Sequence, residues 1–588
     1  MFTKRRIATA VLTLATFIFA PTARPAADNG PDKKDADAAK SDATTKASSA
    51  KEKESSKDPN SAIEAELQQM KDLLNAQQQR ITELETELHA SRTGTDTPAT
   101  APVAAGSPTG SAAINVPTSP AITPMAAPQT GGTVLSGDQG KSPLSFKIGA
   151  ADFTPGGWAD FTGIFRSTDI GSGTGTTFAS MPYNTGLPQA GLSELRLTAQ
   201  TSRISLKVEA PISDSTHVMA YIESDFNGFQ PPNAYLSTNS GTFRLRLYWA
   251  DIRHDKWELM AGQSWSLLTP NRVGLSPLPA DVFSTARLDT NYVAGLTYAR
   301  QAGVRLVYHP TNWWAIGFAL ENPQQYVPSS VVFPGTGTYF SGQFDNGSGA
   351  TNGGGAATNP AVPNLHPDVI VKSAFDWKVG DHALHVEADG LIRSFKDYDN
   401  LITPNTTSTV TGASAGLNAN LELFPKFHLI FDSFYGAGGS RYIGALGPDV
   451  IVRPNGTLSA IHAGSGIGGF EYQVTPTFLF DGYYSGAYFA RDFGLLASTA
   501  TPAPTCEGVS GFTCVGYGFA GSANTNNRAI QEATFGFTKT FWANPNYGKL
   551  QFLSQSSYAT RAPWYVASGA PKDAHAFIQY VDLRYVLP

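Results

Sequence analysis

Residues 417–435 read LNANLELFPKFHLIFDSFY. Leucine or alanine stands at positions 417, 419, 421 and 423, with asparagine or glutamate between them. Alternation with a period of two and one apolar face predicts a half-buried strand. Pro425 and Lys426 interrupt the pattern before a second apolar run begins at Phe427. The stretch therefore predicts two antiparallel strands joined by a tight turn.

The same alternation recurs from about residue 144 onward. In residues 243–249, Phe, Leu, Leu and Trp alternate with Arg244, Arg246 and Tyr248. Gly, Pro, Asn and Asp separate such segments, as turn residues do. The pattern predicts sixteen strands at 158–166, 195–210, 218–225, 243–253, 257–265, 296–308, 313–321, 369–377, 382–393, 413–424, 427–435, 463–474, 477–489, 528–541, 548–558 and 575–585.

The connections between these strands alternate between long and short. Those after odd-numbered strands are long, such as 226–242, 266–295, 322–368 and 490–527. Those after even-numbered strands are short, such as 254–256, 425–426 and 475–476. This alternation around an even strand number is typical of a transmembrane antiparallel β-barrel with short periplasmic turns and long extracellular loops. Both ends of the barrel segment are then expected on the periplasmic side.

Tryptophans lie near several of the short turns. Such residues are expected to form a girdle at the membrane interface, although soluble sandwiches also carry surface aromatics. The long loops favour the membrane interpretation. The tryptophans in question are Trp249, Trp257, Trp313, Trp314 and Trp542.

The second predicted strand changes phase near residues 200–203. Its apolar residues are odd-numbered at Leu195 and Leu197 but even-numbered at Ile204 and Leu206. Either a bulge shifts the alternation at this point, or the upper part of the strand rises above the membrane.

The N-terminus predicts export from the cytoplasm. Lys4–Arg6 precede an apolar run at 7–20, and small residues follow, so residues 1–27 are expected to be a secretory signal peptide rather than a buried helix. Residues 28–60 are rich in Lys, Asp, Glu, Ala and Ser. Such a segment cannot bury enough apolar surface to fold and is expected to be a disordered spacer.

Residues 61–90 carry Ile, Leu and Met at spacings of three and four, with Gln77 at the one polar seam position. This heptad pattern predicts a parallel α-helical coiled coil in the periplasm and leaves open whether two or three chains form it. The alternative is a single amphipathic helix lying on another domain. Residues 91–145 form a Pro/Ala/Gly/Thr-rich linker, which precedes a predicted barrel at 146–588.

Composition excludes several classes of protein. Only 15% of the 588 residues are charged and the net charge is −6, which differs from an ordinary cytosolic enzyme and from a basic nucleic-acid-binding protein. No HExxH or Walker motif is present. His385, Glu387 and Asp389 alternate along one strand face, and a polar barrel wall explains them more simply than a metal site. No cofactor and no metal are therefore predicted.

Cys506 and Cys514 are the two cysteines of the chain, and both lie in a long predicted loop. Export favours a disulfide between them. Two free thiols or a metal pair are the alternatives, but no nearby His or further Cys completes a zinc site.

The predicted barrel contains five notable runs, at Gln200–Ile204, Ala261–Ser266, Tyr298–Gln301, Gly317–Pro323 and Gly438–Ile443. Together, these runs resemble those of the DcaP-like outer-membrane porins. The order of signal, coiled coil, linker and sixteen-stranded barrel resembles that family as well. The chain departs from the usual barrel ending, because it finishes on Leu587 and Pro588 instead of an aromatic residue.

This resemblance implies a homotrimeric porin that takes up organic anions, notably dicarboxylates. Its partners would be small solutes and outer-membrane lipid, with no nucleic acid and with cell-wall contact through the coiled coil left open. By similarity to porins in general, the loop Ser266–Thr290 is expected to fold inward and narrow the pore.

Selectivity in such a channel would come from charged residues on the lumen face. The barrel segment as a whole is acidic, so only the distribution of its basic residues can favour anions. An arginine pairs well with a carboxylate, and the lumen acids Glu223 and Asp225 could hold the arginines in place. The alternative is that these basic residues are solvated wall residues without selectivity. The predicted solute-binding residues at the constriction are Arg203, Lys207, Arg244, Arg246 and Arg305.

The sequence therefore predicts a non-enzymatic bacterial outer-membrane porin for the passive diffusion of small hydrophilic solutes. The alternatives are a structural barrel tethered to the cell wall through its coiled coil, and a barrel enzyme.

Overall fold

The structure is a computed structural model that describes residues 142–183, 187–228, 241–283, 288–335, 340, 342–345, 363–380, 382–399 and 406–588. The predicted signal peptide (1–27), charged spacer (28–60) and coiled coil (61–90), with nearly all of the linker (91–145), lie outside the described residues and stay predictions. In the described ranges, no helix is long and apolar enough to cross a membrane.

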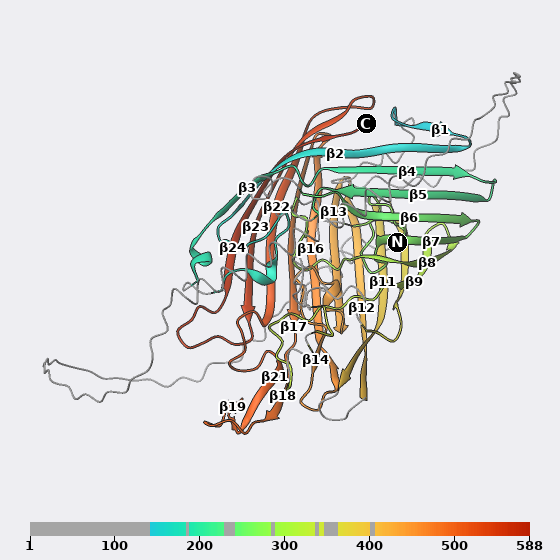
Figure 1. Ribbon diagram of the computed structural model, residues 1–588. Coiled ribbons are helices and arrows are strands. Elements are labelled where there is room, and N and C mark those ends of the chain that lie inside the picture. Colours follow the sequence, from blue (N-terminus) through green and yellow to red (C-terminus); the bar gives the residue numbers. More distant parts are fainter. Residues whose placement is uncertain are drawn as a thin grey trace, which may run out of the picture. The chain divides into compact units, whose positions relative to one another are not determined.

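The described residues form a closed antiparallel barrel of sixteen strands, which confirms the predicted barrel (Figure 1). A short strand, β1 (Phe146–Ile148), precedes the barrel and pairs with β2. The second barrel strand is built from two pieces, β3 and β4. The barrel strands are β2 (Ala151–Arg166), β3 (Glu194–Thr198) with β4 (Arg203–Pro211), β5 (Thr216–Asp225), β6 (Arg244–His254), β7 (Trp257–Trp265), β8 (Arg300–Thr311), β9 (Trp314–Glu321), β10 (Asp368–Val379), β11 (His382–Asp399), β12 (Thr406–Phe424), β13 (Phe427–Ala437), β16 (His462–Thr475), β17 (Phe478–Phe489), β22 (Asn527–Asn544), β23 (Gly548–Pro563) and β24 (Ala574–Val586).

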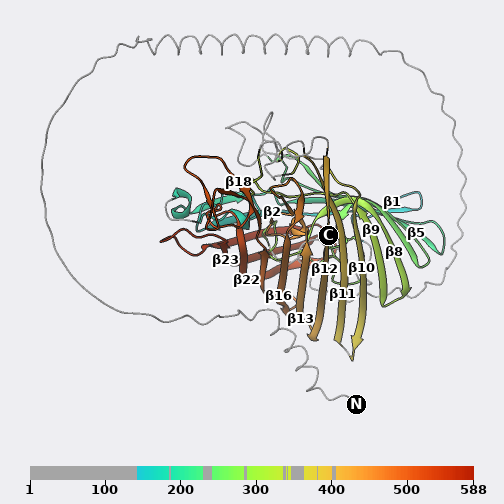
Figure 2. The same ribbon diagram turned by 90° about the horizontal axis from the view of Figure 1, so that it is seen from below.

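The barrel closes where β2 pairs with β24. Nine residue pairs join these two strands, from Trp158 opposite Val586 to Arg166 opposite Ile578. Figure 2 shows strands β8 to β13 side by side in one curved wall. The described chain begins beside its own end, because the Ser142 hydroxyl donates to the Pro588 carbonyl at 2.9 Å. Both ends therefore lie on the side of the short turns.

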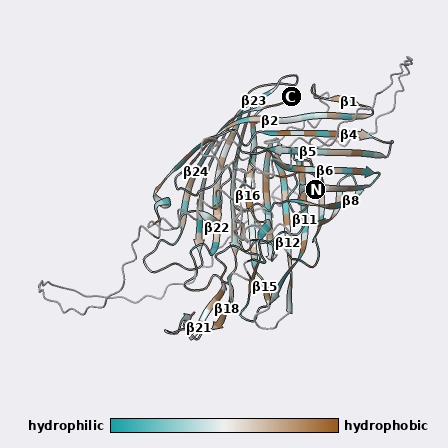
Figure 3. Ribbon diagram, in the orientation of Figure 1, coloured by the Kyte–Doolittle hydropathy of each residue, from teal (hydrophilic) through white to brown (hydrophobic). Residues whose placement is uncertain are grey.

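Side chains alternate between a polar interior and an apolar exterior. Asp432, Glu471 and Glu532 are at most 1% exposed, whereas Leu306 and Leu583 are 40% and 46% exposed. Figure 3 shows this alternation along strands such as β4, β5 and β6. A band of outward apolar side chains around a polar lumen is the surface organisation of a transmembrane barrel.

The phase break near residue 200 is an interruption within one strand. Residues between β3 and β4 form a turn, in which the Ser202 amide donates to the Ala199 carbonyl. Both pieces pair with β2, so the strand leaves the sheet and rejoins it with the opposite phase. Leu197 and Ile204 consequently both point outward, with exposures of 54% and 55%.

The predicted alternation in β6 is wrong beyond Arg246. Leu247 and Trp249 are buried inside the barrel, and Tyr248 is 56% exposed. The reason is a bulge, because Glu223 pairs with Leu247 while its neighbour Ser224 pairs with Leu245. The extra residue shifts the side-chain phase by one.

An aromatic belt surrounds the barrel at the short-turn end. The rings of Trp257 and Tyr308 lie 4.5 Å apart between centroids, and those of Trp313 and Trp377 lie 6.3 Å apart. Trp249 does not belong to the belt, because it is buried against Tyr221. Its place was mispredicted for the same reason as the phase of β6.

The long loops pack together at the other end of the barrel. Phe178, Phe344 and Val450 are at most 2% exposed and belong to one apolar cluster. The short elements in these loops are η1 (Phe178–Ser180), η2 (Pro188–Gly191), η3 (Ser440–Tyr442), β14 (Val450–Val452), β15 (Leu458–Ala460), β18 (Asp492–Ala497), β19 (Thr505–Cys506), β20 (Val509–Ser510) and β21 (Phe512–Tyr517).

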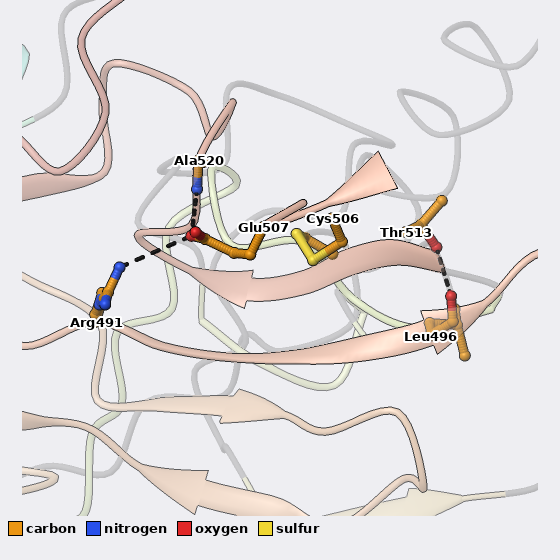
Figure 4. The surroundings of a disulfide bond; sticks show 7 residues. Arg491, Leu496, Cys506, Glu507, Thr513 and Ala520 are labelled. Atoms are coloured by element: carbon orange, nitrogen blue, oxygen red, sulfur yellow. Dashed lines mark hydrogen bonds and ion pairs between the residues drawn. A yellow bond between two sulfur atoms is a disulfide. The ribbon is translucent and has the colours of Figure 1, made fainter. Parts of the chain in front are cut away.

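Cys506 and Cys514 form a disulfide with their Cα atoms 5.2 Å apart. The bond joins β19 to β21, as Figure 4 shows. Beside it, the Glu507 carboxylate accepts the Ala520 amide at 2.8 Å and lies 3.8 Å from Arg491. These contacts fix the hairpin that extends from β18 and β21.

Replacing both cysteines by serine should loosen this hairpin without unfolding the barrel. Closing a loop of this size is worth about 2.5 kcal/mol in the chain-entropy treatment, and the loss stays local. We expect faster proteolysis between β18 and β21 and an unchanged melting temperature of the barrel. A melting temperature that falls by many degrees would contradict this local role.

Candidate constriction site

The loop between β7 and β8, described at residues 266–283 and 288–299, folds into the barrel. Its backbone amides donate to acidic side chains on distant strands. The Asn271 amide lies 3.1 Å from both Glu387 carboxylate oxygens, and the Ala294 amide lies 2.9 Å from Glu532. The Leu288 amide donates to Gln555 at 2.7 Å. The expected inward folding of the loop is therefore present in the structure.

One ion pair ties the loop to the far wall. Both terminal nitrogens of Arg272 lie 2.9 Å from the two carboxylate oxygens of Glu471 on β16. The two side chains are 7% and 0% exposed. Burial lowers the pKa of the Arg272 guanidinium, but the negative charge of Glu471 outweighs this and raises the pKa overall.

Replacing Arg272 by alanine should destabilise the barrel strongly, because Glu471 would stay buried without its counter-charge. Breaking a buried pair on one side costs about 3–5 kcal/mol. Urea unfolding of the refolded barrel measures this loss. The double variant Arg272→Met with Glu471→Gln removes both charges and should regain most of the stability. Equal losses in the single and double variants would argue against this ion pair as an anchor.

Basic residues hold the loop from its other side. Arg305 donates to the Trp265 carbonyl at 2.7 Å and to the Leu275 carbonyl at 3.4 Å. Lys372 donates to the Thr269 carbonyl at 2.8 Å. Arg305 is buried, so its guanidinium supports the loop backbone, and its predicted role as a solute contact has no support in this geometry.

Four arginines gather around two carboxylates where the loop meets strands β4 to β8. Arg246 lies 2.6 Å from Glu223 and 2.8 Å from Asp225. Arg244 binds Asp225 through two nitrogens, at 2.9 and 2.7 Å. Arg203 lies 3.3 Å from Glu223. The two acids thus hold the arginines, in the arrangement expected from the sequence.

Arg300, the first residue of β8, is the fourth arginine. Its guanidinium carbon lies 5.8 Å from the centre of a Trp265 ring, and that of Arg246 lies 5.9 Å from the same residue. Tyr292 and Tyr298 of the loop pack edge-on against Trp265 at 6.0 and 6.2 Å. Such cation–π contacts orient guanidinium groups without neutralising them.

The arginine cluster, defined as Arg203, Arg244, Arg246 and Arg300, carries more positive charge than its acids cancel. Four guanidinium groups against Glu223 and Asp225 leave a net charge of +2. Arg244 is the most accessible member of the three ion-paired arginines, with 35% of its side chain exposed. The cluster therefore presents a positive surface to the lumen.

The loop borders a cavity on each side. A cavity of about 300 Å³ lies toward the long loops and is lined by Arg196, Arg244 and Asn291, among other polar residues. A cavity of about 430 Å³ lies toward the short turns and is lined by Arg253 and by residues 272–276 of the loop. The arginine cluster contributes to the first of these through Arg244.

No protein-family model and no curated protein sequence matches this chain. Among solved structures, the outer membrane channel DcaP of Acinetobacter baumannii is similar with a TM-score of 0.51 and 14% identity, covering 75% of this chain and 99% of that one. The outer-membrane expressed OmpT of Vibrio cholerae is similar with a TM-score of 0.38 and 10% identity, over 75% and 99% of the two chains. An anion-selective porin from Comamonas acidovorans has a TM-score of 0.37 and 10% identity, over 74% and 99%.

The chain has the fold of an outer-membrane channel. The resemblance to DcaP-like porins that the sequence motifs suggested is thereby confirmed for the fold. At 14% identity, the similarity concerns the fold alone. Any inference about the solute and the residues that bind it rests on the chemistry of the site.

Lys207 is the remaining predicted site residue. Lys207 lies further along β4 and pairs with Glu209 at 2.9 Å. Burial raises the pKa of the Asp281 carboxyl in the loop. The nearby positive charge of Lys207 partly offsets this rise. Lys207 therefore lies near the loop, and its role in solute binding stays a prediction.

Arg300 and Arg196 were not predicted as site residues. In β8 the outward residues Val304 and Leu306 are even-numbered. Regular alternation would therefore predict Arg300 on the outside of the barrel as well. The strand begins at Arg300, directly after the loop, and alternation does not hold there. The only sequence signal was the run Tyr298–Gln301, which contains Arg300.

His385 and Glu387 belong to the polar wall, as the simpler interpretation expected. The two nitrogens of His385 lie 2.7 Å from Asp376 and 3.1 Å from Glu387. Asp376 and Glu387 in turn accept loop amides from Gly274 and Asn271. In the part of the chain that the structure describes, no group of three or more His, Cys, Asp or Glu is arranged to hold a metal ion.

Proposed function

We propose that this chain is a passive outer-membrane porin that admits small organic anions, such as dicarboxylates. The arginine cluster carries the proposal. Its net charge of +2 attracts anions, and its planar guanidinium groups match the geometry of a carboxylate.

The loop 266–299 supports this function because it concentrates the selectivity in one narrow region. A sixteen-stranded barrel without an inward loop would enclose a wide aqueous channel. Here the loop contacts strands on several sides of the lumen, so solutes must pass beside it. The acids of the far wall are largely bound to loop amides or basic side chains, which weakens their hold on passing cations.

Solute would meet the polar cavity at Arg196 and Arg244 before it reaches the rest of the cluster. One carboxylate can displace part of the contact between Arg244 and Asp225, because Arg246 also binds Asp225. A second carboxylate on the same solute can then reach Arg300. No covalent step and no cofactor are needed for this passage.

We further propose that the protein works as a homotrimer in the bacterial outer membrane, with its N-terminal region in the periplasm. The outward apolar band and the aromatic belt support the membrane location. The heptad pattern at 61–90 supports self-association, and both ends of the described chain lie on the side of the short turns.

Single-channel recording in a planar bilayer tests the proposal, first with chloride and then with succinate as the anion. We expect openings in groups of three and a reversal potential that shows anion preference. An inserted, correctly folded barrel that conducts nothing would remove the porin function. The tethering or enzymatic alternatives would then remain.

A further inference from the structure

The cavity of about 300 Å³ beside the arginine cluster is polar on every side. Each of the described residues that surround it is a glycine, an uncharged polar residue or an arginine. Three segments meet there, at residues 173–175 after β2, 227–228 after β5 and 290–291 of the inward loop. We call this space the entrance cavity. Its volume is at the small end of the range for ligand pockets, so it suits a small solute that is polar along its length.

Two arginines supply hydrogen-bond donors to the entrance cavity. Arg244 donates to Asp225 through Nε and Nη2, at 2.9 and 2.7 Å. Its Nη1 donates to no residue in the described ranges of the chain. Arg196 donates through Nη2 to the Gln200 amide oxygen, and a guanidinium group carries five N–H donors in all. Both arginines can therefore donate to a solute carboxylate in this cavity.

A short chain of hydroxyl groups supplies an acceptor in the same cavity. The Thr174 hydroxyl donates to the Asn227 amide oxygen at 3.0 Å, and the hydroxyl oxygens of Thr174 and Thr290 are 3.2 Å apart. A hydroxyl group has only one hydrogen, and that of Thr174 is directed to Asn227. Thr290 is therefore the donor to Thr174. The Thr290 oxygen keeps acceptor lone pairs for a further partner.

The Thr290 oxygen is left uncovered by the neighbouring loop. Thr290 is half-buried, and Gly175 lies directly beside it. A Cβ atom at position 175 would stand 2.6 Å from the Thr290 oxygen, closer than real Cβ atoms approach. The missing side chain of Gly175 thus leaves space in which a solute group can reach this acceptor.

Donors and an acceptor in one cavity distinguish between classes of carboxylate. A carboxylate has acceptors only, so it matches Arg196 and Arg244 but offers nothing to the Thr290 oxygen. A hydroxyl group on the same solute can donate to that oxygen. A solute without the hydroxyl loses this hydrogen bond and leaves the acceptor unmatched, which is the basis of strong discrimination in polar sites.

We propose that the entrance cavity is a binding site for hydroxy-acid anions, a class that includes hydroxylated dicarboxylates. Arg196 and Arg244 bind a carboxylate of the solute, and the solute hydroxyl donates to Thr290. The inference rests on the proposed function, because the cavity lies on the proposed path of the solute. It adds a preference for hydroxylated anions over plain dicarboxylates of the same charge.

Isothermal titration calorimetry of the detergent-solubilised full-length protein tests the site with malate and succinate. The two probes have the same carbon chain and charge and differ in one hydroxyl group. We expect a dissociation constant for malate about fivefold below that for succinate, because one additional hydrogen bond separates the two complexes.

Thr290→Val keeps the shape of the side chain and removes its oxygen. In this variant the affinity for malate should fall to that for succinate, while the affinity for succinate stays unchanged. Thr311→Val is the matched control, because Thr311 lines the other cavity, on the short-turn side of the loop. This control should keep the preference for malate. The shift of the folded barrel on unheated gels verifies each variant before titration.

Equal dissociation constants for malate and succinate in the unaltered protein would overturn the proposed site. Failure of both probes to bind, or a preference for malate that persists in Thr290→Val, would overturn it as well. Conductance is recorded separately on the same samples. A barrel that prefers malate but does not conduct would contradict the porin function and leave the site intact. A barrel that conducts anions without preferring malate would contradict the site alone.

Discussion

Replacing Arg244 and Arg300 together by serine is expected to abolish most of the anion preference of the channel. The exchange lowers the net charge of the arginine cluster from +2 to zero. A unit charge about 6 Å away changes the energy of a small ion in water by about 0.7 kcal/mol, or roughly threefold in its permeability. Two charges therefore change the permeability of the anion by about tenfold before salt screening. The reversal potential in a chloride gradient measures this change.

This double variant should remain folded, because Asp225 keeps its contact with Arg246 at 2.8 Å. Arg246 itself is a poor choice for the test, since it is buried and binds both acids of the cluster. Arg528 provides the matched control. It is an exposed arginine near Trp564 at the long-loop end of β22, and Arg528→Ser should leave the reversal potential unchanged. The control removes one positive charge and the double variant removes two. A shift for Arg528→Ser about half as large as that of the double variant would therefore show that selectivity follows overall charge and not the cluster.

Shortening the inward loop is expected to raise the single-channel conductance severalfold. Replacing residues 270–295 by a short Gly/Ser linker removes Arg272, Phe283 and Tyr292 from the lumen. Phe283 and Tyr292 belong to a buried cluster that fills the space beside Trp249 and Ile467 on the barrel wall. The pore cross-section grows when that space becomes aqueous, and conductance rises with it. Anion preference should fall at the same time, because ions can pass farther from the arginines.

The control is an equally simple exchange outside the barrel, in which a Gly/Ser linker replaces residues 498–511. These residues lie in the disulfide-bonded hairpin and make none of the loop contacts in the lumen that are described above. Its conductance should match that of the unaltered protein. Unchanged conductance after the loop replacement, in a barrel that still shifts on unheated gels, would show that residues 270–295 do not limit ion flow.

The sequence determined the strands well because the barrel wall is built from local alternation. Each strand must present apolar residues to lipid and polar residues to the lumen, and this requirement is visible as a period of two in segments such as 417–423. The short turns, such as Pro425–Lys426, followed from the same pattern. The predicted number of sixteen strands and the closure of the barrel depended only on these local signals.

Alternation failed where the backbone departs from regular pairing. The bulge opposite Glu223 turned Leu247 and Trp249 inward, and the turn between β3 and β4 reversed the phase at Ile204. A bulge depends on how two strands pair, and one strand's sequence does not contain that information. The prediction for Trp249 was wrong for this reason.

The sequence placed three arginines of the cluster together correctly, while their role in solute binding stays a prediction. Arg203, Arg244 and Arg246 were found together with their acids because adjacent strands β4, β5 and β6 carry them in matching register. Arg305 points to the loop backbone instead, and Arg300 joins the cluster from the beginning of β8. The course of the loop decides the different positions of these two arginines. Contacts between distant residues fix that course, such as the one between Arg272 and Glu471, which lie 199 positions apart in the sequence.

By itself, the sequence determined the strands, the lumen side of most residues and the pairing of three arginines with two acids, because neighbouring residues and adjacent strands decide these features. Only the tertiary structure decided where the inward loop lies and which arginines remain accessible beside it. These features depend on contacts between distant segments, whose free energies are set by burial and geometry after the barrel has closed.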